Sequence, residues 1–132
     1  MRRPARRIGA EDGQALVEFA LVLPLLLLVL FGVVEFGLLF STTLTLNEAA
    51  RDGARYASVG ASDAQILQVV NQDCASLNTA ALTVVTSPAS ASRLAGDPVS
   101  VTVEYPVTLV PSLAGLPSGT ILLKAEITMR ME

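Results

Sequence analysis

A carboxylate inside an apolar run is the feature of this sequence most open to chemistry. Glu18 follows Gly13-Gln14-Ala15-Leu16-Val17 and is the only charged residue from Val17 to Val34. A carboxylate inside a membrane helix costs about 2.5–3.5 kcal/mol on insertion scales, so Glu18 needs a partner or a route to water. The simplest explanation is that it reaches the inner headgroups, only a few residues from Asp12.

A second explanation is that the peptide bond after Gly13 is cut. Cleavage would leave Gln14 with a free α-ammonium group and would remove the arginines that precede it. If that ammonium paired with Glu18 of an adjacent subunit, the cost of burying both charges would be offset. The pair would also fix the axial offset between neighbours, as buried polar groups can in helix assemblies. An N-terminal glutamine can also cyclise, however, and the resulting lactam has no charge to pair.

The apolar run is long enough to cross a bilayer, because about 18 nearly uncharged residues suffice for a helical span. The first seven residues carry four arginines and no acid, whereas five basic and ten acidic residues follow from Gln14 onward, a balance of 5 − 10 = −5. The positive-inside rule then places the N-terminus in the cytoplasm and the rest outside. The run is longer than a cleavable signal core, and no convincing Ala-x-Ala site precedes Glu48-Ala49-Ala50, so we expect it to remain as a single-pass anchor.

Four regions are expected along the chain: a leader at 1–13, unlikely to be ordered, a transmembrane helix at 14–40, its extracytoplasmic continuation at 41–59, and a small head at 60–132. A helix of about 45 residues is roughly 68 Å long, so its second half must project from the membrane. Pro24 removes one backbone hydrogen bond and should kink this helix. Gly60 is a natural stop for it.

The head is predicted to be α+β. Ser62 and Gln65 have the spacing of a capping box, which opens a short helix that fades by Ser76. Strands with a period of two follow at 82–86, 99–105 and 121–130, with loops at 87–98 and 111–119. Pro106 should end or bend the middle strand. A roughly three-stranded antiparallel sheet and the short helix would pack on the exposed half of the long helix.

The composition argues against catalysis and cofactors. The chain has no histidine and one cysteine, so a zinc site of the Cys/His type and an intramolecular disulfide are excluded within one chain. No Gly-rich phosphate loop follows a strand, and no Ser or Cys has a nearby base. Cys74 is either a small buried apolar residue or, less simply, half of an intermolecular bridge.

Three further charged residues are candidates for an interface. Glu35 lies 17 residues after Glu18, about 25 Å along a helix, and is either an unpartnered carboxylate at the outer membrane surface or an interface residue. Arg51 and Arg55 lie one turn apart and form either a solvated face or a site for an acidic partner. The N-terminal arginines lack interleaved aromatics, so nucleic acid is not an expected partner.

The segment Gly13–Pro24 resembles the start of TadE-like proteins, the minor pilins or pseudopilins of the Flp (tight-adherence) pilus system. The resemblance continues through Phe31–Gly37 and Asn47–Ala57 and, less specifically, from Val101 to Glu132. It implies cleavage after Gly13 by a prepilin peptidase, a membrane-embedded aspartic protease. It also implies insertion in the bacterial cytoplasmic membrane, with Glu18 at the fifth mature position followed by Phe19, where related pilins often have Tyr.

The family resemblance implies a pilin-like fold, with one long N-terminal membrane-spanning helix that continues into the small head, and a role in pilus assembly and adhesion. The expected partners are the prepilin peptidase, other pilin or pseudopilin subunits, pilus assembly membrane proteins and the lipid bilayer. The alternative is an unprocessed single-pass protein with a periplasmic binding domain. Both have the same topology, so the mass of the mature protein distinguishes them.

Overall fold

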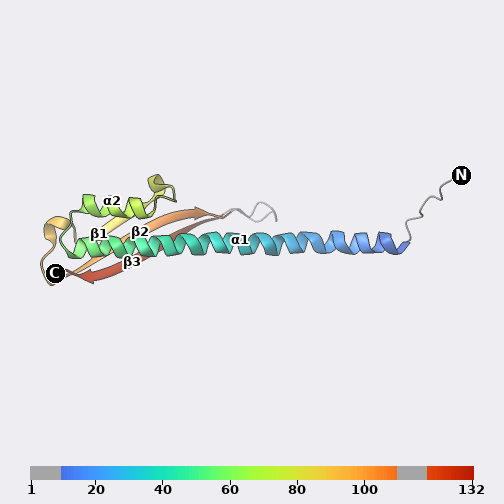
Figure 1. Ribbon diagram of the computed structural model, residues 1–132, viewed down its shortest axis with the longest axis horizontal. Coiled ribbons are helices and arrows are strands. Elements are labelled where there is room, and N and C mark those ends of the chain that lie inside the picture. Colours follow the sequence, from blue (N-terminus) through green and yellow to red (C-terminus); the bar gives the residue numbers. More distant parts are fainter. Residues whose placement is uncertain (1–9, 110–118) are drawn as a thin grey trace.

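A computed structural model of the chain describes residues 10–109 and 119–132. One long helix runs the length of the molecule, and a small head covers its C-terminal end (Figure 1). The elements in chain order are α1 (Ala10–Ser58), α2 (Asp63–Asp73), η1 (Thr79–Ala81), β1 (Thr83–Ser87), η2 (Ser90–Ser92), β2 (Pro98–Thr108) and β3 (Thr120–Arg130). The α+β layout predicted from the sequence is confirmed.

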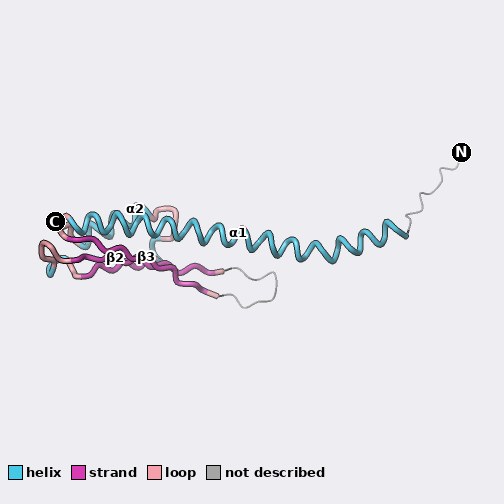
Figure 2. Tube along the Cα trace, turned by 90° about the horizontal axis from the view of Figure 1, so that it is seen from below, coloured by secondary structure: helices cyan, strands magenta, loops and turns pink. Residues whose placement is uncertain are grey.

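Helix α1 has 49 residues and contains Pro24 without a break in the helix. Figure 2 shows that α1 bends in its N-terminal half. The sequence predicts a kink at Pro24, which lies in that half of the helix. The helix also begins earlier than expected: Ala10 to Gly13, assigned to the disordered leader, form its first turn. Strong helix formers follow directly, so the helix propagates back into the leader at little cost.

The C-terminal end of α1 is set by Gly60, as predicted. Its φ of +84° is a left-handed conformation that glycine adopts without a steric penalty. The Gly60 N–H donates to the Ala57 carbonyl at 3.1 Å, and the Ala61 N–H donates to the Tyr56 carbonyl at 3.0 Å. These two bonds form a Schellman motif, which satisfies the last carbonyls of the helix and turns the chain back toward it.

The capping box at the start of α2 is also confirmed. The Ser62 hydroxyl accepts a hydrogen bond from the Gln65 N–H, and the Gln65 side chain accepts one from the Ser62 N–H at 2.9 Å. The capping box therefore provides acceptors for the Ser62 and Gln65 backbone N–H groups, which have no carbonyl partner at the start of the helix. The antiparallel return of α2 along α1 follows from the short 59–62 turn.

The three strands form one antiparallel sheet in the order β1-β2-β3. The register pairs Val101 with Ile127 and Val103 with Ala125, so the alternating apolar residues of both strands face the same side. Pro106 does not end β2, contrary to one of the two predicted outcomes: it pairs with Leu122, and the strand continues to Thr108. The loop predicted at 111–119 falls, apart from Gly119, outside the described residues.

Both helices cover one face of the sheet, which gives a two-layer head (Figures 1 and 2). The buried apolar core draws on every layer. It comprises Leu46, Ala49, Ala50, Ala54 and Ala57 of α1, Ile66, Val70 and Cys74 of α2 and its cap, Val99, Val101 and Val103 of β2, and Ala125 of β3. The α1 contribution is mostly alanine, which lets the helix approach α2 and the sheet closely. Cys74 is fully buried, as its simpler explanation predicts.

Candidate assembly segment and the head that orients it

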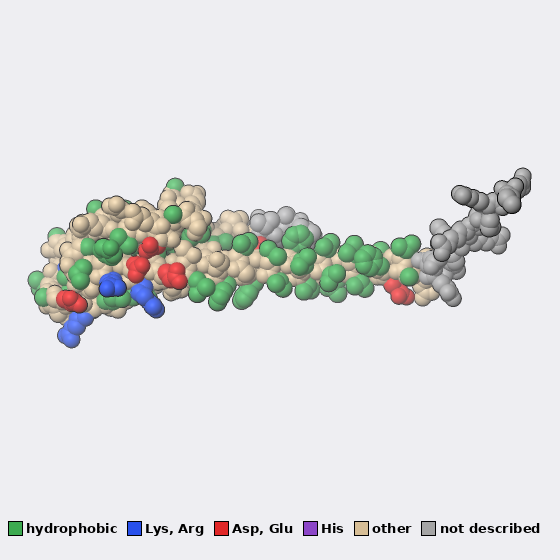
Figure 3. Space-filling model, in the orientation of Figure 1, with side chains coloured by type: hydrophobic (Ala, Val, Ile, Leu, Met, Phe, Trp, Pro, Cys, Tyr) green, Lys and Arg blue, Asp and Glu red, His purple; other side chains and the backbone are tan. Residues whose placement is uncertain are grey.

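The N-terminal half of α1 is an apolar rod that projects from the head (Figure 1). Its large side chains from Leu16 to Leu44 are mostly exposed, and Figure 3 shows apolar side chains along this half of the helix. The helix is long and apolar enough to cross a membrane, with a mean hydropathy of 2.8 over its most apolar window. Burial of this surface must therefore come from lipid or from other chains.

Gln14 and Glu18 lie on one face of the first turns of α1. The Gln14 side-chain amide donates to the Glu18 carboxylate over 3.3 Å, an i,i+4 contact. The structure thus brings together the two residues that the sequence singled out for pairing, within one uncut chain. A charged α-ammonium would be a stronger donor to this carboxylate than a neutral amide, because charge-assisted hydrogen bonds are about twice as strong.

Gly13 has no packing reason to be glycine. A Cβ atom built on it meets no atom of the described chain within 4 Å, although glycine inside a helix costs about 1 kcal/mol relative to alanine. Phe19 and Pro24 are exposed as well, so neither supports the fold of the head. Packing within the described residues explains none of these three residue types.

A band of polar residues marks where the apolar half of α1 ends. The hydroxyls of Thr42 and Thr43 donate to the carbonyls of Leu38 and Leu39, each at 2.9 Å. The Asn47 amide donates to the Thr43 carbonyl at 2.8 Å. These side chains satisfy their polar groups on their own helix, as polar residues at the edge of a membrane must when water is scarce.

Arg51 and Arg55 are exposed on the outer side of α1 within the head. Arg55 borders an open hollow of about 380 Å³ that Asp52, Tyr56 and Val59 also line. Glu35 is half-buried and lies within the rod, far from both arginines. The structure therefore separates the predicted site residues into an N-terminal group, Glu35, and an arginine pair on the head.

Gly53 is a residue whose importance the sequence reasoning missed. A Cβ on Gly53 would lie 3.0 Å from Val70 Cγ2 and 3.2 Å from Val101 Cγ1. Glycine is thus what allows α1 to contact both α2 and β2 at this level. The signal was present in the sequence, since Gly53 lies among the small residues that form the buried face.

Asp63 and Arg93 form a second feature that the sequence did not show. The Arg93 side chain, only 2% exposed, forms an ion pair with Asp63 and donates to the carbonyls of Ala61 and Pro88 at 2.7 and 3.0 Å. Asp63 also accepts from the Thr86 hydroxyl at 2.9 Å. This cluster ties the start of α2 to the end of β1 and to the 88–93 segment.

The two carboxylates of α2 have opposite electrostatic environments. Partial burial raises the pKa of Asp63, but hydrogen bonds from Ser90 and Thr86 and the Arg93 charge together outweigh it, so the net pKa is lowered. At the other end of the helix, partial burial and the nearby charges of Asp52 and Glu48 raise the pKa of Asp73.

Cys74 follows Asp73 and is held as an unreactive thiol. Burial, with a smaller effect from the Asp73 charge, raises the pKa of this thiol. A thiol in this state is a poor nucleophile and a poor partner for disulfide exchange.

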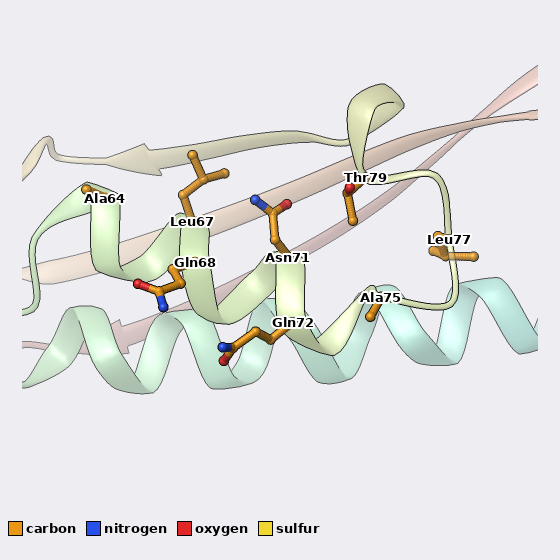
Figure 4. Close-up of a pocket in the computed structure, with 8 residues that line it drawn as sticks. All are labelled: Ala64, Leu67, Gln68, Asn71, Gln72, Ala75, Leu77 and Thr79. Atoms are coloured by element: carbon orange, nitrogen blue, oxygen red, sulfur yellow. The ribbon is translucent and has the colours of Figure 1, made fainter.

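A pocket of about 590 Å³ lies on the outer side of α2. Figure 4 shows its lining, which includes Leu67, Gln68, Asn71, Gln72, Leu77 and Thr79. The lining is amides and apolar groups, with no charged side chain. Across the described residues, no group of three His, Cys, Asp or Glu side chains could hold a metal ion. None of the residues that line this pocket is a nucleophile beside a base.

The model of the TadE-like protein family matches residues 13–55. Residues 13–55 are TadE-like. The matched stretch begins at Gly13, includes Glu18 and Pro24, and ends at Arg55 within the head, so it agrees with the resemblance that this part of the sequence shows. No curated protein and no solved structure matches the chain. The match thus covers most of α1. For the rest of the head, no comparison adds to what the structure shows.

Proposed function

We propose that the chain is a minor pilin or pseudopilin of a tight-adherence (Flp-type) pilus. The TadE-like match points to a pilin-like protein associated with this pilus, a structural component and not an enzyme. The observation that carries the proposal is the combination of that match with a rod whose apolar surface is exposed along its length. Such a rod needs lipid before assembly and other helices after it.

In this proposal a prepilin peptidase cuts after Gly13. Support comes from Gly13 itself, because no contact within the described chain accounts for a glycine there. The cut would fall in the first turn of α1, where helix ends fray most readily. It would remove the leader arginines and leave Gln14 as the new N-terminus, one turn from Glu18.

We further propose that Glu18 accepts the new α-ammonium group of a neighbouring subunit. In the uncut chain its partner is the neutral Gln14 amide of the same helix, and a charged donor would displace this contact. One turn of helix separates the two groups, so the pair would offset neighbouring rods by about 6 Å. The partners would be other pilin or pseudopilin subunits and the membrane proteins that assemble the pilus.

The proposed topology is a single pass through the bacterial cytoplasmic membrane. Residues 1–13 would be the leader, 14–40 the span, 41–59 its continuation and 60–132 the extracytoplasmic head. The arginine-rich N-terminus and the acidic remainder support this orientation through the positive-inside rule. Incorporation in the fibre and adhesion would follow extraction of the rod from the membrane.

Glu18→Gln tests the pairing, because it keeps the shape of the side chain and removes its charge. Normal cleavage and membrane insertion are expected, with loss of the subunit from sheared surface fibres and from cross-linked adducts with other pilins. Glu35→Gln is the matched control: Glu35 is about 31 Å along the helix from the cut and cannot reach a neighbour's N-terminus at a one-turn offset. If Glu18→Gln assembled as well as the wild type, Glu18 would have no assembly role.

A further inference from the structure

We infer that the end of the β2–β3 hairpin, at Val107, Leu109, Ile121 and Leu122, contacts the outer surface of the bilayer that α1 crosses. The head would then touch the membrane at a second place, beside the helix that anchors it. The inference rests on the membrane anchoring in the proposed function. It adds an interaction surface that lies outside the matched residues 13–55.

The hairpin points toward the membrane half of α1. Figures 1 and 2 both show β2 and β3 extending alongside α1 from the head toward its N-terminal half. The pairing also continues past the strands, because the Leu109 N–H donates to the Gly119 carbonyl at 3.0 Å. The Leu109 N–H and the Gly119 carbonyl are therefore satisfied before the hairpin meets an apolar medium.

The depth of the hairpin end follows from one contact in the core. Val101 lies level with Gly53, since a Cβ on Gly53 would be 3.2 Å from Val101 Cγ1. Val107 is six residues further along β2, which is about 20 Å of strand. The same distance along α1 is about 13 residues, which places Val107 and its partner Ile121 near the level of Phe40.

That level is the boundary between apolar and polar α1. Phe40 is exposed and ends the apolar run. Thr42 and Thr43, whose hydroxyls donate to carbonyls of the same helix, follow two residues later. The hairpin end and the end of the apolar run of α1, which are far apart in the sequence, thus lie at the same level along the axis of α1. If α1 crosses the bilayer up to this boundary, the end of the hairpin lies at the outer headgroups.

The side chains at the hairpin end fit a lipid surface. Ile121 and Leu122 are 41% and 59% exposed. The sequence contains no Asp, Glu, Lys or Arg between Glu104 and Lys124. The first charged residues back from the hairpin end are Glu104 and Lys124, which pair with each other and lie nearer the head. Apolar side chains at the headgroup boundary, with charges set back from it, are the pattern of an interfacial membrane contact.

The test uses the full chain in phosphatidylcholine vesicles at low protein density, with an environment-sensitive fluorophore on a single introduced cysteine. Leu122→Cys reports on the hairpin end. Val85→Cys is the matched control, because Val85 is 52% exposed on β1 and pairs with Thr102, well back from the hairpin end. Leu30→Cys, 55% exposed in the rod, reports on anchoring itself. Cys74 is buried, and labelled wild-type protein provides the blank.

We expect a nitroxide-bearing phosphatidylcholine to quench the label at 122 and to leave the label at 85 unchanged, with a blue-shifted emission at 122. Quenching at 30 but not at 122 would overturn the inference and leave the anchoring intact. Absence of quenching at 30 would reject the anchoring, and the inference with it. A shielded label at 122 that responds to protein density and not to quencher lipid would identify a second copy as the partner and would also overturn the inference.

Discussion

The two halves of α1 share one continuous helix and have opposite surroundings. From Leu16 to Leu44 the large apolar side chains are exposed, whereas from Leu46 to Ala57 one face is fully buried against α2 and the sheet. The glycines differ in the same way. Gly13, Gly32 and Gly37 have open space where a Cβ would be, and Gly53 has contacts at 3.0 and 3.2 Å.

The comparison shows what each half requires. The C-terminal half is specified by contacts within the chain, so its residues can be explained by packing in the head. The N-terminal half carries Gly13, Glu18 and Pro24, whose residue types no packing in the head explains. In the proposed function, these residue types are required by the bilayer, by the peptidase and by neighbouring subunits.

The largest expected effect is on the core that makes the C-terminal half different. Ile66→Ala removes a fully buried side chain and should destabilise the head by about 2–5 kcal/mol. Leu67→Ala, at the next position of α2 but 45% exposed, should change stability by less than about 0.5 kcal/mol. Denaturant titration in detergent, followed by the reaction of the buried Cys74 thiol with a thiol reagent, measures both. Equal effects would contradict the core described here.

The glycine comparison predicts the next effect. Gly53→Val places methyl groups against Val70 and Val101 and should cost about 1–3 kcal/mol of head stability. Gly37→Val introduces the same side chain into open space on the rod and should leave the head unchanged. The same thiol titration applies. A destabilised head in Gly37→Val would mean that the rod is coupled to the head through contacts that the structure does not show.

Loss of the α2 cap should be smaller. Ser62→Ala removes the acceptor for the Gln65 N–H and should cost about 1 kcal/mol. Ser76→Ala, an exposed serine beyond the end of α2, serves as the control. Far-ultraviolet circular dichroism during thermal unfolding is the measurement, and an unchanged midpoint in Ser62→Ala would show that the capping box contributes nothing.

The smallest effects concern the two ends of α2 and have opposite signs. The pKa of Asp63 is lowered in the folded state, so its charge stabilises the head above the ordinary pKa of 3.8, and this is lost as the pH falls through the lower folded value. Asp63→Asn should therefore destabilise the head at neutral pH, by less than about 1 kcal/mol because Asp63 is 41% exposed.

Asp73 should behave in the opposite way, because its pKa is raised by partial burial and by Asp52 and Glu48. Its charge opposes folding above the raised pKa, and the effect disappears as the pH falls below the ordinary value of 3.8. Asp73→Asn should stabilise the head slightly at neutral pH and leave it unchanged in acid. The free energy of unfolding, measured against pH for both variants, tests these opposite effects. If both substitutions destabilised or both stabilised the head at neutral pH, the opposite pKa shifts of Asp63 and Asp73 would be contradicted.

The sequence predicted the elements of this fold well because their signals are local. The Ser62 capping box, the Gly60 stop and the alternation along β2 and β3 each depend on residues close in the chain. The contacts that join Gly53 to Val101 and Asp63 to Arg93 span long separations, so local patterns did not show them. The sequence left open whether Pro106 ends or bends the strand, because its place in the paired strand depends on the register with β3.

The candidate site divides in the same way. Gly13, Gln14 and Glu18 could be found from the sequence because they are close together and break an apolar pattern, and the family match covers all three. The hairpin end could not be placed near the membrane from the sequence, because its height depends on how the sheet packs on α1.

The central claim is that the exposed rod is a processed pilin helix, and the N-terminus of the protein from its own host tests it most directly. Intact mass and N-terminal peptide mass spectrometry should show a chain that begins at Gln14, as the free amine or its cyclised form. A Gly13→Arg variant should keep residues 1–13. A wild-type chain that retains Met1 and the leader arginines would contradict the account and leave an uncut, membrane-anchored head.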